Sequence, residues 1–229
     1  MLAGVVSVIA IDGPVAAGKT VVGRELARRL GFKYLDTGIM YRAVGWLARQ
    51  QAVHIEDEEA VGKLAQSASI RIVGEDSDQV MVGEQPVGPE LRSPDMARYA
   101  SLVATIPEVR RAMVREQRAM AAGGKIVMVG RDIGTVVLPN ADLKVFLTAS
   151  VEERARRRWR EFRREGREVD FSEVLQETRA RDRRDSTRAD SPLVPAQDAF
   201  LVETTDNDVN QVVDLILEQV QQRFGVAEK

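Results

Sequence analysis

The sequence of 229 residues contains no cysteine, so disulfides, cysteine-ligated metal sites and a thiol nucleophile are excluded. Its single histidine, His54, excludes histidine-rich metal sites and limits any Ser-His-Asp triad to that position. The longest apolar run, residues 5–11, is far shorter than the ~20 residues of a membrane span. No basic segment precedes this run and no cleavage-like site follows it, so we expect no signal peptide. These absences predict a cytoplasmic protein without a membrane partner.

Neither sign of charge dominates the chain. Its 33 basic and 35 acidic residues leave a net charge of −2, so we expect no nucleic-acid partner gathered by a basic field. Of the basic residues, 27 are arginine. The planar guanidinium suits bidentate binding of phosphate, although coding bias of the source genome would give the same excess. With 44% hydrophobic residues, this length predicts one globular domain with room for an inserted subdomain.

Short apolar stretches alternate with amphipathic ones along most of the chain. They predict strands at residues 5–11, 32–35, 126–129, 143–147 and 199–202. Helices are expected at residues 19–30, 38–51, 107–122 and 209–224. Two more should begin at capping-box patterns, Ser150 with Glu153 and Asp170 with Glu173, on either side of Gly166. The alternation predicts an α/β fold with a central parallel five-stranded sheet flanked by helices.

Residues 70–95 interrupt this alternation. Two short strands are expected at residues 70–73 and 79–82, separated by a polar turn. Pro86, Pro89 and Pro94 then exclude a long regular element. We therefore expect a small β subdomain inserted into the α/β domain.

A complete phosphate-loop motif, G-x-x-x-x-G-K-S/T, follows the first predicted strand and opens the first predicted helix. It consists of Gly13, Pro14, Val15, Ala16, Ala17, Gly18, Lys19 and Thr20. Inward-pointing N–H groups and the helix N-terminus favour phosphate, Lys19 can reach the β- and γ-phosphates, and the Thr20 hydroxyl can ligate Mg²⁺. The alternative is a chance glycine turn. The motif predicts binding of a nucleoside triphosphate, and the missing Asn-Lys-x-Asp and Asp-x-x-Gly motifs exclude a GTPase switch.

Polar clusters stand at the ends of other predicted strands, where ligands bind in α/β sheets. Asp36, Thr37 and Arg42 follow the second strand, Arg131 and Asp132 follow residues 126–129, and Arg181, Asp185 and Arg188 have the spacing of one helix face. Each cluster has a plainer interpretation. The first would be a helix cap by Asp36 or Thr37, the second an ion pair in a turn, and the third a solvated salt-bridge face.

Five stretches together resemble bacterial cytidylate kinases in order and spacing, over about residues 6–200. They are IDGPVAAGKT, LGFKYLDTGIMYRAV, ASLVATIPEVR, GRDIGTVVLPNADLKVFLTASVEERARRR and RARDRRDSTRADSPLVPA. Adenylate kinases share the loop but carry an Asp-Gly-Phe-Pro-Arg stretch that is missing here. The resemblance implies a P-loop kinase that transfers phosphate from ATP to CMP or dCMP with Mg²⁺, working as a monomer. It also implies a core (about residues 1–55, 123–152 and 186–229), a nucleoside-monophosphate-binding region with the insert (56–122) and a lid with the following helix (153–185).

The resemblance also assigns roles to residues. For the acceptor it implies that Thr37, Arg42, Arg131 and Arg188 hold the phosphate, that Ser101, Arg110 and Asp132 recognise cytosine, that Arg181 and Asp185 hold the sugar, and that Asp36 lies beside the transfer site. For ATP it implies the loop, the adjoining Val21, and lid arginines among Arg154, Arg157 and Arg158. The catalytic set would be Lys19, Arg131 and Arg188. Cytosine offers an N4 donor for a carboxylate, and O2 and N3 acceptors for arginine and hydroxyl groups.

Two positions depart from the family pattern. Ala16 stands where glycine is common, and is tolerable with a negative φ or in the left-handed region at modest cost. Val21 stands where a second hydroxyl residue is usual, which predicts a lower affinity for ATP.

Three other functions stay open at this point. A kinase for UMP or a non-nucleotide acceptor would carry the same loop, and a nucleotide-dependent binding module would bind ATP without forming ADP. An RNA-binding protein would use residues 152–190, with 13 arginines and the aromatics Trp159, Phe162 and Phe171. However, 11 acidic residues in this stretch nearly cancel its charge, so solvated ion pairs are expected instead.

Overall fold

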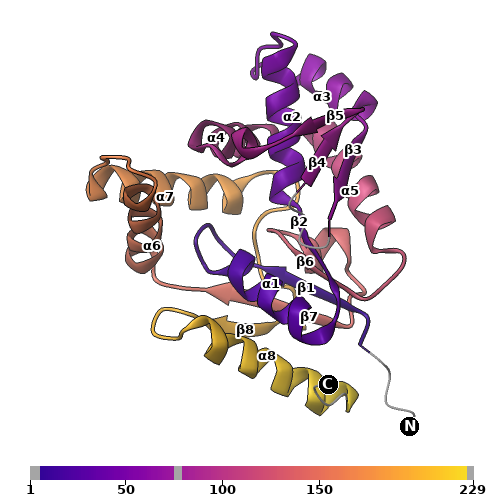
Figure 1. Ribbon diagram of the computed structural model, residues 1–229, viewed down its shortest axis with the longest axis vertical. Coiled ribbons are helices and arrows are strands. Elements are labelled where there is room, and N and C mark those ends of the chain that lie inside the picture. The colour runs from indigo at the N-terminus through magenta and orange to yellow at the C-terminus, as the bar shows by residue number, and fades with distance from the viewer. Residues whose placement is uncertain (1–5, 75–78, 226–229) are drawn as a thin grey trace.

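A five-stranded parallel sheet forms the centre of the molecule (Figure 1). The computed structural model describes residues 6–74 and 79–225. The strands are β1 (Val8–Asp12), β2 (Lys33–Asp36), β6 (Ile126–Val129), β7 (Leu143–Thr148) and β8 (Phe200–Glu203), in the order β2-β6-β1-β7-β8. The predicted α/β fold is therefore confirmed. The predicted first strand is shifted along the chain: β1 begins at Val8 and includes Asp12, while residue 5 lies outside the described residues.

Both faces of this sheet are covered, as the apolar sequence of β1 predicts. On one face, Ile9 and Ile11 pack in a cluster with α1 (Lys19–Leu30) and α8 (Val209–Phe224). On the other, Ala10 packs with the end of α5 (Pro107–Ala121) and with η2, the π-helical turn Ile133–Val137. The alternation of neighbouring residues between two clusters is the two-residue period of a strand buried on both sides.

The inserted region has a core of its own. The helices α2 (Gly38–Gln50), α3 (Glu58–Ser67), α4 (Pro94–Val103) and α5 share an apolar cluster with a three-stranded antiparallel sheet, β3 (Ile70–Val73), β4 (Gln79–Val82) and β5 (Gln85–Val87). Strands β3 and β4 are as predicted. Strand β5 is not among the predicted strands; the prolines exclude only a long element, and a three-residue strand at the edge of the sheet tolerates Pro86. The predicted division of the chain stays a prediction, although α2, placed there in the core, packs with this region.

Two helices, α6 (Val151–Arg164) and α7 (Phe171–Thr187), form an arm beside the sheet (Figure 1). Ala155, Phe162 and Val174 are buried between them. Side chains of Ser150 and Asp170 cap the two helices at the predicted positions. Within the part of the chain that the structure describes, no helix is both long and apolar enough to cross a membrane.

Candidate active site

A tight loop joins β1 to α1, in the context that the phosphate-loop motif requires. Gly13 has φ +150°, and a Cβ on it would lie 2.2 Å from the carbonyl oxygen of Leu147, so glycine alone fits there. Ala16 has φ +58°, the left-handed conformation that is tolerable for alanine at modest cost. The loop therefore keeps its tight backbone without a glycine at residue 16.

Lys19 begins α1, and its side chain turns back into the loop. Its Nζ atom donates hydrogen bonds to the carbonyl oxygens of Gly13 and Pro14, each at 2.7 Å. Burial holds the pKa of Lys19 well below its ordinary value, and the nearby Arg131 lowers it further. An anion bound in the loop would favour the charged ammonium again, so this position suits a polyphosphate.

Thr20, at the end of the loop, and Asp36, at the end of β2, provide oxygen atoms that suit a divalent cation. The Thr20 hydroxyl donates to Asp36 Oδ2 at 3.3 Å. Among residues 6–74 and 79–225, no group of three or more acidic, histidine or cysteine side chains could hold a metal. This pair fits Mg²⁺, which is usually held by one or two protein oxygens together with phosphates and water.

The second predicted strand end is only partly as expected. Asp36 Oδ1 accepts a hydrogen bond from the N–H of Gly38 at 3.0 Å, so Asp36 helps to cap α2. Thr37 stands at the N-cap position, but its side chain does not cap the helix. Its hydroxyl donates instead to the carbonyl oxygen of Val129 at 2.9 Å, which joins the start of α2 to the end of β6.

A buried ion-pair network lies beyond the end of β6. Asp132 Oδ2 accepts a short hydrogen bond from Arg110, and Asp132 Oδ1 accepts one from Arg188 at 3.2 Å. Arg110 is 2% exposed, and its guanidinium also lies 3.4 Å from the Tyr41 hydroxyl and 3.7 Å from Asp190. The structure thus brings together three predicted residues from distant parts of the sequence.

A second ion pair joins Arg131 to α7, with its Nε atom 2.8 Å from Asp185 Oδ2. Although burial opposes the shift, Arg131 and Arg181 hold the pKa of Asp185 below its ordinary value. Burial, followed by the charge of Arg131, lowers the pKa of Arg181 to about 9. The predicted helix face is correct for Arg181 and Asp185 but wrong for Arg188, which follows the end of α7 in extended conformation.

Arg42 lies one turn into α2, close to the same group of charges. Its Nη1 atom donates to the carbonyl oxygen of Leu91 in η1 (Pro89–Arg92) at 3.2 Å. Burial lowers the pKa of Arg42, while the carboxylate of Asp36 acts against that shift.

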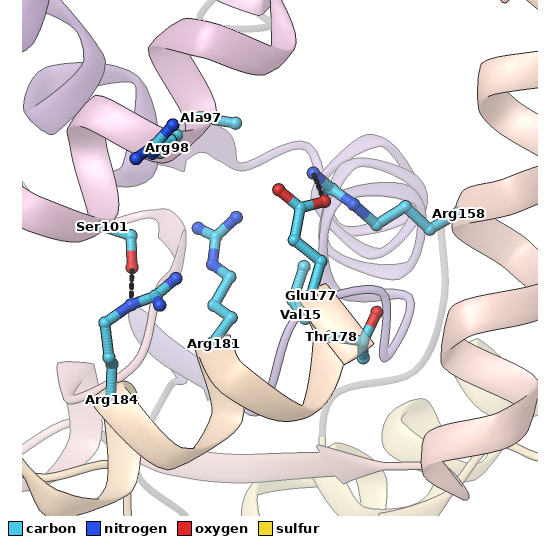
Figure 2. A pocket seen from close by; sticks show the side chains of 9 residues that line it. All are labelled: Val15, Ala97, Arg98, Ser101, Arg158, Glu177, Thr178, Arg181 and Arg184. Carbon is cyan, nitrogen blue, oxygen red and sulfur yellow. Dashed lines mark hydrogen bonds and ion pairs between the residues drawn. The ribbon is translucent and has the colours of Figure 1, made fainter. Parts of the chain in front are cut away.

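A pocket opens between the phosphate loop, α4 and the arm (Figure 2). Ser101 on α4 accepts a hydrogen bond from Arg184 Nε of α7 at 3.4 Å. The side chain of Arg181 extends between them and Glu177 into the pocket. The lining residues are Val15, Ala97, Arg98, Ser101, Arg158, Glu177, Thr178, Arg181 and Arg184. Its four arginines against one carboxylate make the pocket suitable for an anion.

The arginines of α6 that the resemblance places in a lid differ from one another in their surroundings. Arg157 donates to the Thr204 hydroxyl at 3.0 Å and to the Ala16 carbonyl oxygen at 3.5 Å, beside the phosphate loop. Arg158 lies 4.0 Å from Glu177 at the edge of the pocket. Arg154, expected over ATP, is buried. It forms two hydrogen bonds with Asp182, at 2.9 and 2.7 Å, and donates to the carbonyl oxygen of Val15 at 3.3 Å. Arg154 therefore connects α6, α7 and the loop in this structure.

Replacing Arg154 with alanine is expected to lower the free energy of unfolding by about 2 kcal/mol, because Asp182 and the Val15 carbonyl lose a buried partner. Urea unfolding measures this loss. Arg156→Ala is the matched control on the same helix, since its exposed guanidinium pairs with Glu153, and we expect less than about 0.5 kcal/mol there. Equal losses in the two variants would contradict the buried role of Arg154.

Sequence reasoning missed Asp12, Asp182 and Arg184. Asp12 is buried at the end of β1 and accepts hydrogen bonds from two backbone N–H groups of another loop. A carboxylate that directly ends an apolar strand could have drawn attention to it. The partners of Asp182 and Arg184 lie 28 and 83 residues away, and no local pattern indicates them.

Comparison with known proteins by sequence finds one family, both in the family model and in the relatives. The sequence model of the family "Cytidylate kinase" matches residues 9–222. A cytidylate kinase of Pelotomaculum thermopropionicum is 48% identical, over 93% of this chain and 95% of its own. One of Desulfitobacterium hafniense is 47% identical, over 91% and 90%. Among solved structures, an uncharacterized protein from Eubacterium ventriosum shares the fold with a TM-score of 0.54 at 14% identity, covering 95% of this chain and 99% of that one.

Proposed function

The chain belongs to the cytidylate kinase family, and on that premise we propose how its residues carry out the family's reaction. It is an ATP-dependent nucleoside monophosphate kinase that transfers the γ-phosphoryl group of ATP to CMP or dCMP, giving ADP and CDP or dCDP. The observation that carries the proposal is the position of Asp132. This carboxylate lies beyond the end of β6, next to the strand that leads into the phosphate loop, and it is held by two arginines.

ATP binds at the phosphate loop. The residues in contact with it are Gly13, Pro14, Val15, Ala16, Ala17, Gly18, Lys19, Thr20 and Val21, with Arg157 and Arg158 from the lid. Lys19 holds the β- and γ-phosphates, since its buried ammonium already points into the loop. Thr20, with Asp36 beside it, would hold Mg²⁺, which neutralises developing charge on the phosphates when bound. Val21 is 51% exposed. Its apolar side chain cannot donate the hydrogen bond to ATP that a hydroxyl at this position would donate.

CMP binds on the other side of the transfer point. Asp132 accepts the N4 amino group of cytosine, while Arg110 and Ser101 donate to its ring acceptors. Asp185 and Arg181 hold the sugar. Thr37, Arg42, Arg131 and Arg188 bind the acceptor phosphate. Burial and then the charge of Arg131 lower the pKa of Arg181 to about 9, and a phosphate bound beside these arginines would oppose that shift.

The reaction is an in-line displacement at the γ-phosphorus. A phosphate oxygen of CMP forms the new P–O bond, the bond to the β,γ-bridging oxygen breaks, and ADP leaves with that oxygen. The acceptor is already an anion, so no covalent enzyme intermediate is needed. Lys19, Arg131 and Arg188 lower the barrier by orienting the two phosphates and neutralising their charge. Closure of α6 and α7 over the site keeps water away from the γ-phosphate.

Product analysis tests this function directly. With γ-phosphate-labelled ATP and CMP, we expect the label in CDP and little in inorganic phosphate. Label in phosphate alone would indicate an ATPase, and ATP binding without turnover would indicate a binding module. A cytoplasmic location and a monomeric state are part of the proposal, and light scattering after size-exclusion chromatography measures the second.

A further inference from the structure

Asp12 is a buried carboxylate that the proposed reaction does not use. It is the last residue of β1, is 5% exposed, and directly precedes the phosphate loop. Both of its oxygens accept hydrogen bonds from backbone N–H groups, Oδ1 from Ile133 at 2.8 Å and Oδ2 from Gly134 at 2.7 Å. These two residues follow Asp132, the candidate for recognition of cytosine. One side chain thus joins the end of the ATP-binding strand to the acceptor-binding loop.

The N–H groups that Asp12 binds are those at the start of the π-helical turn η2. The first N–H groups of any helical turn lack partners within it, and the N-cap side chain usually supplies one. Asp132 occupies that position but makes no capping hydrogen bond with its side chain. Its carboxylate binds Arg110 and Arg188 instead. Asp12 caps the turn from a neighbouring strand, so the Asp132 carboxylate is available to ligand and arginines.

We propose that Asp12 is a positioning residue for CMP: it holds residues 130–134 in register with the phosphate loop and releases Asp132 from capping its own turn. This inference rests on the proposed function, because it assumes that Asp132 contacts the acceptor base. The parallel pairing of Ile11 with Val129, and a hydrogen bond from Gly130 N to Ile11 O at 3.0 Å, bring the two loops together. Asp12 adds two further bonds beyond the ends of these strands.

The ionisation of Asp12 provides a readout that a merely structural residue would lack. Burial raises its pKa to about 6, against the effect of the two N–H bonds. Of the charged groups around it, Asp132 raises this pKa and Lys19 lowers it. The side chain of Lys144 on β7 lies against Gly134, and its ammonium pairs with Asp198. When the pH falls through about 6, the protonated carboxyl places an O–H against one N–H donor. Binding of CMP should then weaken.

The test is Asp12→Asn in the full chain. Asparagine keeps one acceptor and turns an NH₂ group toward the other N–H, so we expect the KM for CMP to rise roughly 10-fold, with the KM for ATP within about 2-fold. Asp142→Asn is the matched control, because Asp142 accepts N–H bonds from Ser7 and Val8, each at 2.8 Å, at the opposite end of the same strand. That variant should leave both KM values unchanged. Equal rises for CMP and ATP in Asp12→Asn, or no change in either, would overturn the proposal.

A pH series gives the second readout. The phosphate of CMP also titrates near pH 6. We therefore compare the KM for CMP of Asp12→Asn divided by that of the wild-type enzyme, because the titration of CMP cancels in this ratio. The ratio should fall from about 10 near pH 7.5 to about 3 near pH 5.5, where roughly three quarters of the wild-type carboxyl groups are protonated. A constant ratio would contradict a positioning role for the ionised group.

If Asp12→Asn does not fold, amide NMR of the wild-type protein tests the proposal instead. The Ile133 and Gly134 amide signals should titrate together with a midpoint of about pH 6 and move again when CMP binds. Signals that do neither would overturn the inference. Failure of the proposed function would look different, since the wild-type enzyme would then form no CDP.

Discussion

Replacing Lys19 with alanine is expected to slow phosphoryl transfer to CMP by roughly 10²–10³-fold, the loss typical when one charge-stabilising donor is removed from an active site. The Lys19 ammonium lies within the loop, where it donates hydrogen bonds to the carbonyl oxygens of Gly13 and Pro14. Burial lowers its pKa. Bound phosphate would favour the charged form of Lys19, so this side chain contributes most when phosphate charge shifts between donor and acceptor. Its loss should therefore lower kcat more than it raises the KM for ATP.

The fold should survive this change. Lys19 gives the loop two hydrogen bonds, but its charge is kept out of water, so we expect the free energy of unfolding to change by about 1 kcal/mol or less. A coupled assay of ADP formation and urea unfolding measure the two effects. Lys33→Ala, at an exposed lysine that begins β2, is the control and should keep full activity. Near-normal turnover of Lys19→Ala would overturn the assignment of the loop.

Replacing Asp132 with asparagine should change both substrate choice and stability. A carboxylate accepts the N4–H of cytosine and repels the O4 carbonyl of uracil. Asparagine presents either a donor or an acceptor, so the KM for CMP should rise by about 10²-fold and the preference for CMP over UMP should narrow by a similar factor. Steady-state kinetics with each nucleotide measures this ratio. An unchanged ratio would remove Asp132 from recognition of the base.

The same variant should lower the free energy of unfolding by about 3 kcal/mol, because Arg110 and Arg188 lose the carboxylate between them while Arg110 stays buried. Asp190, 3.7 Å from Arg110, offsets part of the loss. Asp198→Asn is the matched control: its exposed carboxylate pairs with Lys144, and we expect a loss below about 0.5 kcal/mol. If added CMP raises the free energy of unfolding of the wild-type protein but not that of Asp132→Asn, CMP binding and stability depend on the same carboxylate.

Local patterns were sufficient for much of the fold. The helices at residues 19–30 and 209–224 and the strand at 126–129 have the predicted limits, because each carries its own period and end signals. Strand β5 escapes such reasoning, since three residues around Pro86 form a strand only against β4. The pairing of five strands likewise depends on contacts far apart in sequence.

The site divides in the same way. The phosphate loop can be predicted because its residues are consecutive and each has a local reason. The partners within the acceptor site cannot, because Arg110 meets Asp132, and Arg131 meets Asp185, only when the chain folds. Arg154 is a further case: the resemblance places it in a helix over ATP, but no local pattern indicates the buried pair with Asp182 that connects the two helices.

The arginine-rich arm also bears on the RNA-binding alternative. Five of its arginines lie within ion-pair distance of carboxylates of the arm, as solvated or structural pairs would. These pairs are Arg154–Asp182, Arg156–Glu153, Arg157–Glu153, Arg158–Glu177 and Arg179–Glu152. Such pairing reduces the positive field available to a polyanion, and it agrees with the near-balance of charge in residues 152–190.

The most direct measurement is ADP formation from ATP and Mg²⁺ with CMP, dCMP, UMP, AMP and GMP supplied separately. A site in which Asp132, Arg110 and Ser101 recognise cytosine predicts kcat/KM values for CMP and dCMP at least about 100-fold above those for the other three. Similar values for all five, or turnover with none by a folded protein that binds ATP, would contradict the acceptor site while leaving the phosphate loop intact.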